Sequence, residues 1–163
     1  MRNIAIYKAT LDNEEIDQLK SVLQAKDDLS KVLEFEEKMV KYIGAKYAIA
    51  TATSTAALHL ALSSMRLKRG DKVLMSVNSF VNLPETVRHF DAEPIFVDIN
   101  LEDMNLDIEK FEEAIIANKS IKLRAAIITF IGGLAPNLDK IYEIGKKYNI
   151  LIIEDCRAAL GTT

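Results

Sequence analysis

Cysteine, histidine and tryptophan are scarce in this sequence. Cys156 is the only cysteine, there are two histidines, and there is no tryptophan. One cysteine cannot form an internal disulfide, and the sequence offers no Cys/His cluster of the kind that ligates zinc. We therefore predict neither a disulfide framework nor a metal site. We expect His59 and His89, which lie in apolar helix-like segments, to be core or boundary residues.

The sequence also lacks an excess of either charge and any long apolar run. Its 21 Lys and Arg residues and 24 Asp and Glu residues are mixed along the chain and give a net charge of −3. Binding to a phosphate backbone needs a concentrated positive surface, so we expect no nucleic-acid partner. No segment approaches the roughly 20 apolar residues of a membrane-spanning helix, and the N-terminal residues do not resemble a signal peptide. We therefore expect a cytoplasmic protein with no membrane partner.

What the sequence does contain is a regular alternation of strand and helix patterns. Its 163 residues are 49% hydrophobic, which is enough for one domain with a buried core. After a short extended start, helical spacing predicts two leading helices, and apolar runs then alternate with amphipathic segments. The predicted helices are 11–26, 28–45, 54–67, 82–90, 107–119 and 137–149, and the predicted strands are 46–50, 72–77, 94–99, 124–130 and 150–155.

The predicted strands are continuous apolar runs, which is typical of parallel strands covered on both faces. We therefore predict an α/β fold with a mostly parallel sheet flanked by helices. Residues 1–45 would form lead-in helices, and residues 46–163 the sheet region of one domain. The last strand is followed only by "CRAALGTT", with no helix to cover its flank, so we expect an exposed apolar face. The sequence looks like the N-terminal portion of a longer domain.

Hydroxyl residues gather where the predicted strand 46–50 turns into the predicted helix 54–67. They are Thr51, Thr53, Ser54 and Thr55. A helix N-terminus presents unpaired N–H groups, so Ser54, Thr55 and the N–H groups of Ala56 and Ala57 could hold a phosphate. The alternative is that Thr53 or Ser54 simply caps the helix. Neither the P-loop pattern nor Gly-x-Gly-x-x-Gly is present, so an ordinary nucleotide-binding loop is not predicted.

Two further candidates follow other predicted strands, at the edge where open α/β sheets bind ligands. Glu154 and Asp155 end a buried strand, and buried acids need partners. Asp155 could pair with a protonated ring nitrogen of a cofactor, or it could cap the next segment or form a salt bridge with Arg157. Phe80 could stack on a flat ligand, or it could belong to the core.

Together these residues resemble the DegT/DnrJ/EryC1/StrS family of pyridoxal-phosphate-dependent sugar aminotransferases, which have fold type I. The segments that carry the resemblance are "VLEFEEKMVKYIGAKYAIATATSTAALHLAL", "RGDKVLMSVNSFVNLPETVRHFDAEPIFVDIN" and "LDKIYEIGKKYNILIIEDCRAALG". The resemblance implies pyridoxal 5′-phosphate (PLP) as the cofactor. It implies that Thr55 and Ala56, with Ser54 beside them, contact the phosphate, that Phe80 stacks on the pyridine ring, and that Asp155 pairs with the ring nitrogen.

The resemblance further implies an activity: transfer of an amino group, with glutamate as donor, to a nucleotide-linked keto sugar by a homodimer. Ala158 stands where the family commonly has Gln or His, and Phe130 stands where the family frequently has His. The family's Schiff-base lysine lies beyond residue 163, so we expect this chain alone to be inactive. Two alternatives stay open: a non-catalytic remnant or binding subunit of the same fold, and the family's dehydratase branch, in which a histidine replaces the lysine.

Overall fold

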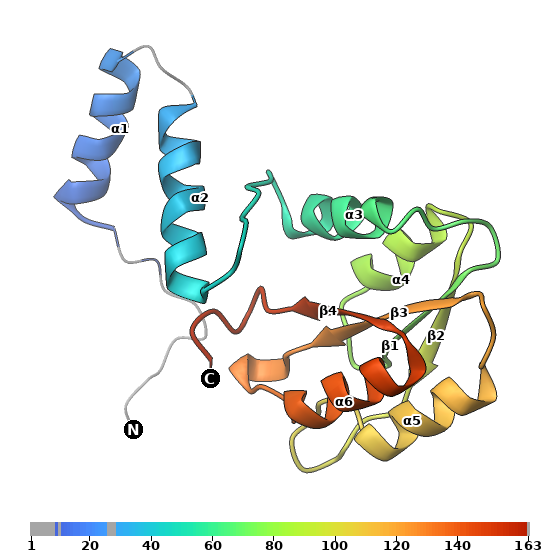
Figure 1. Cartoon of the computed structure of the whole chain (residues 1–163). Coiled ribbons are helices and arrows are strands. Elements are labelled where there is room, and N and C mark those ends of the chain that lie inside the picture. The colour runs from blue at the N-terminus through green and yellow to red at the C-terminus, as the bar shows by residue number, and fades with distance from the viewer. Residues whose placement is uncertain (1–8, 10, 26–28, 163) are drawn as a thin grey trace. The chain divides into compact units, whose positions relative to one another are not determined.

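The structure is a computed structural model that describes residues 9, 11–25 and 29–162 (Figure 1). The chain divides into two compact units, residues 1–50 and residues 51–163. The predicted extended start falls almost entirely on residues outside the described ones. Among the described residues, no helix is long and apolar enough to cross a membrane.

The second unit is built on a parallel sheet of four strands. They are β1 (Lys72–Ser76), β2 (Glu93–Val97), β3 (Leu123–Thr129) and β4 (Leu151–Asp155). The strands lie in the order β2-β1-β3-β4, and every neighbouring pair is parallel. The central strands β1 and β3 are almost fully buried, as their continuous apolar sequences predict. The predicted α/β fold with a parallel sheet is confirmed.

Helices cover both faces of this sheet. They are α3 (Ser54–Ser64), α4 (Asn82–Arg88), α5 (Ile108–Ala117) and α6 (Leu138–Tyr148). α3 and α4 pack on one face, and α5 and α6 pack on the other (Figure 1). Because successive strand residues point to opposite faces, Met75 and Ile127 belong to the core under α3 and α4, whereas Leu74 and Ile128 belong to the core under α5 and α6.

The strand order places a crevice at the carboxyl edge of the sheet. From β1 the chain passes through α4 to β2 on one side, and it then returns through α5 to β3 on the other side of β1. The loops that follow β1 and β3 therefore leave the sheet toward opposite faces. Such a reversal of strand order is where open α/β sheets bind their ligands.

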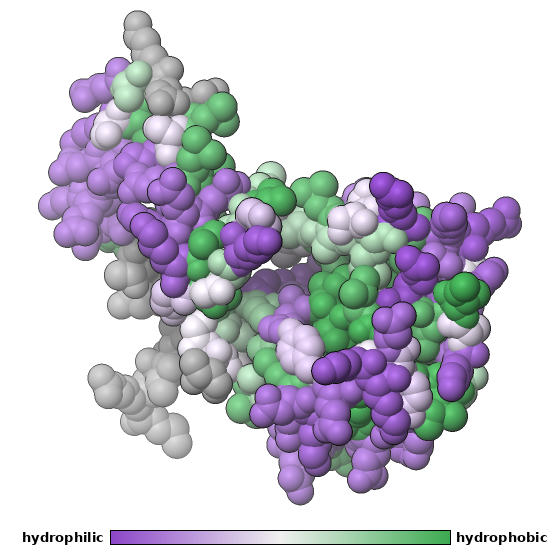
Figure 2. All heavy atoms as spheres, in the orientation of Figure 1, coloured by the Kyte–Doolittle hydropathy of each residue, from purple (hydrophilic) through white to green (hydrophobic). Residues whose placement is uncertain are grey.

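β4 forms an edge of this sheet and is less covered than β3. Leu151 is 56% exposed, and the next two residues of the strand are only partly buried. Figure 2 shows hydrophobic surface over β4, between α3 and α6. The exposed apolar surface that we predict beside the last strand is therefore present.

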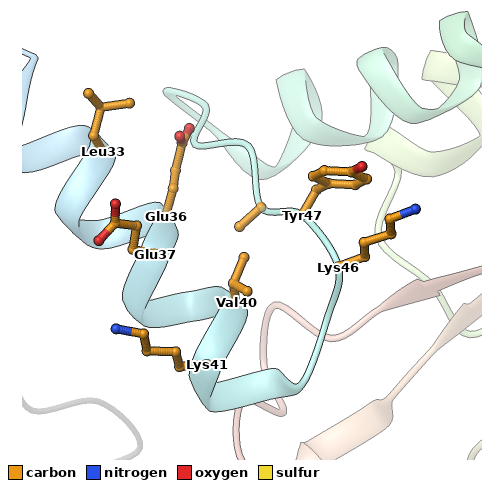
Figure 3. A pocket seen from close by; sticks show the side chains of 8 residues that line it. Leu33, Glu36, Glu37, Val40, Lys41, Lys46 and Tyr47 are labelled. Carbon is orange, nitrogen blue, oxygen red and sulfur yellow. The ribbon is translucent and has the colours of Figure 1, made fainter.

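The first unit contains α1 (Asn13–Ala25) and α2 (Ser30–Ile43), close to the two predicted helices. α2 ends at Gly44, whose left-handed backbone (φ 72°) lets its N–H donate to the carbonyl of Val40 over 2.9 Å. A hollow of about 520 Å³ lies between α2 and the segment that follows it. Figure 3 shows Val40 and Glu36 directed toward this segment, while Lys41 points away.

The prediction of a strand over 46–50 is wrong. Residues 47–50 form no regular element and pair with no strand among the described residues, and Tyr47 and Ile49 are 74% and 76% exposed. Among their backbone N–H groups, that of Ala50 donates to the Glu36 carboxylate over 2.7 Å. A strand requires a neighbouring strand to satisfy its N–H and C=O groups. The apolar sequence indicates a strand, but it does not show whether a neighbouring strand is present.

Two histidine predictions are also corrected. His59 on α3 and His89 at the end of α4 are both exposed rather than buried in a core. The His59 ring lies 4.7 Å from the ring of Phe90 and 6.2 Å from that of His89, measured between centroids. The buried side of α3 consists of Leu58 and Leu62, whereas His59 and the neighbouring Leu60 lie on its exposed side.

Candidate functional site

The candidate site is a cavity of about 290 Å³ at the carboxyl edge of the sheet. It is lined by residues 78–80 after β1, by residues 129–132 at the end of β3 and just beyond it, and by Asp155 at the end of β4 with Arg157 and Ala158 after it. These segments meet at the reversal of strand order. The structure thus brings Phe80 and Asp155, two of the predicted site residues, to the same cavity.

The N-terminus of α3 shows which hydroxyl groups serve the helix itself. The Thr53 hydroxyl accepts the N–H of Ala56 over 3.1 Å and is the N-cap, and the Thr51 hydroxyl donates to the Thr53 carbonyl. Capping by Thr53, one of the two interpretations of this stretch, is therefore present. The N–H of Ala56 is occupied by that cap, whereas the N–H groups of Ser54 and Thr55 find no acceptor among the described residues.

Thr55 is linked to the cavity through two side chains. Asn82, the first residue of α4, donates from Nδ2 to the Thr55 hydroxyl over 3.1 Å. Arg157 donates from Nη1 to Oδ1 of the same Asn82, also over 3.1 Å. This relay joins the start of α3, the start of α4 and the turn after β4. Thr55, at the predicted phosphate end of the site, is therefore connected by hydrogen bonds to Arg157.

Arg157 also contacts both predicted ring-binding residues. Its Nη2 lies 3.1 Å from Oδ2 of Asp155, and its Cζ lies 5.2 Å from the centroid of the Phe80 ring. The Asp155 side chain is only 13% exposed, whereas Phe80 is 64% exposed and open to a stacking ligand. The salt bridge with Arg157 that we consider as an alternative for Asp155 is present in the structure.

Two polar atoms in this region are buried without a hydrogen bond among the described residues: Thr129 Oγ1 and Asp155 Oδ2. The contact of Asp155 Oδ2 with Arg157 has the distance of an ion pair but not the angles of a hydrogen bond. Thr129 and Asp155 are register partners on β3 and β4. Buried polar groups are rarely left unpaired, so these adjacent atoms are suited to a polar ligand in the cavity.

Glu154 finds a different set of partners from Asp155. Tyr142 on α6 donates a hydrogen bond to Glu154 Oε1, and this bond raises the pKa of Tyr142 to about 12. The Cys156 thiol lies 3.7 Å from Glu154 Oε2. Burial, followed by the Glu154 carboxylate, raises the pKa of the Cys156 thiol to about 11. The raised pKa keeps the only cysteine of the chain mainly in the neutral thiol form at neutral pH.

We expect Cys156 to react with iodoacetamide about tenfold more slowly at pH 8 in the folded chain than in urea-unfolded chain. A pKa raised by about two units lowers the thiolate fraction about 100-fold, and the greater nucleophilicity of a high-pKa thiolate recovers part of this loss. Glu154→Gln should accelerate the reaction of the folded chain, because it removes the nearby negative charge. Equal rates in the folded and unfolded chains would contradict the assignment.

Sequence reasoning missed three contributors to this site. Asn82 reads as an ordinary residue at a helix start, and Thr129 reads as the end of an apolar strand. Arg157 was considered only as a partner of Asp155. The position of Asn82 two residues after Phe80, at the carboxyl edge of β1, is the one signal that could have indicated its role.

These elements define a class: an open parallel α/β unit with a polar, aromatic-walled ligand site at its topological switch point. A family model described as the DegT/DnrJ/EryC1/StrS aminotransferase family matches residues 9–163. The chain belongs to this family.

Individual relatives support the same placement. The chain is 34% identical over 157 residues to the UDP-4-amino-4,6-dideoxy-N-acetyl-beta-L-altrosamine transaminase of Campylobacter jejuni, covering 93% of this chain and 40% of that protein. It is 33% identical over 132 residues to the GDP-perosamine synthase of Caulobacter vibrioides, covering 81% of this chain and 34% of that protein. The Escherichia coli GDP-4-keto-6-deoxy-D-mannose-3-dehydratase, solved with bound hydrated PLP, superposes with a TM-score of 0.88 at 26% identity, covering 100% of this chain and 43% of that one. The chain thus spans well under half the length of these proteins.

The residues present fit a pyridine cofactor that carries a phosphate. Asp155 Oδ2 is a buried acceptor without a hydrogen bond, and Phe80 offers an open aromatic face in the same cavity. The N–H groups of Ser54 and Thr55 at the start of α3, which find no acceptor among the described residues, can donate to an anion. The donor set therefore agrees with the cofactor that the family uses.

Proposed function

We propose that this chain is the cofactor-binding part of a PLP-dependent enzyme that transfers an amino group to a nucleotide-linked keto sugar. The observation that carries the proposal is the Asp155 carboxylate, whose Oδ2 is buried without a hydrogen bond among the described residues, in a cavity that the exposed ring of Phe80 also lines. A carboxylate in this position favours a protonated ring nitrogen. PLP, when bound, supplies the electron sink for amino-group transfer.

In this proposal each predicted residue has a separate task. Ser54 and Thr55 hold the phosphate through their N–H and hydroxyl groups. Ala56 contacts the phosphate from the first turn of α3 and shares its N–H with the Thr53 hydroxyl. Phe80 packs against one face of the ring, and Asp155 holds the proton of the ring nitrogen. Asn82 positions Thr55 through the 3.1 Å hydrogen bond between their side chains.

The substrate, the donor and the assembly are part of the same proposal. The two transferase relatives are named for GDP-linked and UDP-linked amino sugars, which supports a nucleotide-sugar substrate, with glutamate as the amino donor. We propose that the lysine that binds the cofactor covalently follows residue 163 in the full-length protein. The 163-residue chain would then bind the cofactor without catalysing amino-group transfer. The full-length enzyme would be a cytoplasmic homodimer.

The test compares the 163-residue chain with the product of an in-frame extension of its coding sequence. Each is incubated with PLP, glutamate and GDP-4-keto-6-deoxy-D-mannose or a UDP-linked keto sugar, and products are identified by mass. We expect the aminated sugar and 2-oxoglutarate only from the longer protein, whose extension should carry a Ser-x-x-x-x-Lys-like segment. Turnover by the 163-residue chain alone would contradict the placement of the lysine.

A second candidate is the dehydratase branch of the family. It is favoured by the superposition on the Escherichia coli dehydratase, which covers the whole of this chain. The same assay separates the two candidates, because a dehydratase yields a deoxygenated sugar that carries no new nitrogen. A non-catalytic binding subunit would yield neither product but would still bind the cofactor.

We expect the double variant Ser54→Ala, Thr55→Val to bind pyridoxine 5′-phosphate at least tenfold more weakly. This probe lacks the aldehyde of PLP and so cannot attach to surface lysines. Each charge-assisted hydrogen bond to a phosphate contributes roughly 1.5–3 kcal/mol, and tenfold in affinity corresponds to about 1.4 kcal/mol. Affinity is measured by titration calorimetry.

Thr53→Ala is the matched control, because Thr53 is the N-cap of α3. Loss of the cap should lower the free energy of unfolding by about 1 kcal/mol. The double variant should change the melting temperature less than this control does. If the double variant lowered the melting temperature equally with and without the probe, Ser54 and Thr55 would have only a structural role.

A further inference from the structure

The Arg157 guanidinium lies where three segments of the sheet's carboxyl edge meet. It contacts Asp155 on β4 through Nη2 at 3.1 Å and Asn82 on α4 through Nη1 at 3.1 Å. Its Cζ stands 5.2 Å from the centroid of the Phe80 ring. The group is therefore held by a carboxylate, an amide and an aromatic face within one compact unit.

These contacts are the ones that a protonated pyridine ring would require. Both groups are planar cations, and both can stack on an aromatic face while donating to a carboxylate. Asp155 is mostly buried and lines the cavity, and Arg157 lies against its buried Oδ2, which has no hydrogen bond among the described residues. A ring and the Arg157 guanidinium cannot occupy that place together.

We propose that Arg157 occupies the ring position of the cofactor site in the cofactor-free chain and must leave it before a ring can bind. Arg157 is then a built-in competitor that sets the affinity of the site. This inference rests on the proposed function, since it concerns the same cavity. It adds a residue, Arg157, that the family assignment does not include. In the cofactor-free chain the Arg157 guanidinium pairs with Asp155 and packs against Phe80, and binding of a ring requires Arg157 to move.

The competition predicts the direction and the size of an effect on binding. Affinity is reduced by the fraction of molecules in which Arg157 has left the ring position. A minor conformation of this kind is typically populated at about 10% or less, so removing the side chain should tighten binding about tenfold or more. Loss of a positive charge near an anionic ligand would by itself weaken binding. Tighter binding therefore cannot arise from the charge change alone.

The experiment measures the affinity of pyridoxine 5′-phosphate for the parent chain and for three variants by calorimetry. Arg157→Ala should bind about tenfold more tightly or better. Arg157→Lys keeps the charge but lacks the planar fork that contacts Asp155 and Asn82 together, so it should fall between the two. Arg88→Ala removes an exposed arginine at the end of α4 and should leave affinity unchanged.

A thermal melt of each variant establishes that it is folded, and Arg157→Lys provides the comparison if Arg157→Ala does not fold. Equal or weaker binding by the Arg157 variants, with clear binding by the parent chain, would overturn this inference and leave the proposed function standing. Absence of binding by the parent chain and all variants would overturn both. Tightening in Arg88→Ala equal to that in Arg157→Ala would also overturn the inference.

Discussion

Replacing Phe111 by alanine is expected to lower the free energy of unfolding by about 3–5 kcal/mol, which is the usual cost of deleting a buried aromatic ring. Phe111 lies on α5 with no exposed surface. Its ring belongs to the same core as Leu74 on β1 and Ile141 on α6. The substitution removes an aromatic ring from this shared core and leaves a cavity that the surrounding elements cannot fill without moving. Urea denaturation followed by circular dichroism measures the loss.

Ile116→Ala is the control for this prediction. Ile116 lies on the same helix but is 57% exposed, so its truncation should cost less than about 1 kcal/mol. Both variants introduce alanine into the same helix, so the change in helix propensity is similar in the two. A loss below about 1 kcal/mol for Phe111→Ala would show that α5 does not pack on the sheet as described.

The parallel sheet was predictable because the sequence patterns that indicate its strands and helices each lie within a short segment of the chain. Continuous apolar runs such as that of β3 are required of strands covered on both faces, and helical periodicity separates them. The segment 46–50 shows the limit of this reasoning. It carries the same apolar pattern, but a strand is defined by its neighbour, and neighbours are set by long-range contacts that the local pattern does not encode.

The site was predictable to the level of strand ends but not of side-chain partners. Phe80 and Asp155 follow predicted strands, and the carboxyl edge of a parallel sheet necessarily brings such positions together. The hydrogen bond from Arg157 to Asn82 joins residues 75 positions apart in the sequence. It depends on the conformation of a long side chain, which no spacing rule fixes. The most informative contact of the site therefore required the structure.

Asn105→Ala is expected to lower the free energy of unfolding by about 2–4 kcal/mol, and Asn105 is a residue that sequence reasoning did not single out. Asn105 has no exposed surface. Its Oδ1 accepts the N–H of Ile131 over 3.0 Å, and its Nδ2 donates to the carbonyl of Leu134 over 3.2 Å. Alanine would leave both of these backbone groups without their partner, at about 1–3 kcal/mol for each unsatisfied group.

The same substitution should also weaken the candidate site. Ile131 lines the cavity, and the hydrogen bonds from Asn105 fix both ends of the turn Ile131–Gly133 that follows β3. We therefore expect Asn105→Ala to weaken binding of pyridoxine 5′-phosphate at a temperature where the variant is still folded. Asn100→Ala is the control, because Asn100 lies in the same loop but is exposed, and it should cost less than about 1 kcal/mol. Unchanged stability and unchanged affinity in Asn105→Ala would show that the turn after β3 is positioned without Asn105.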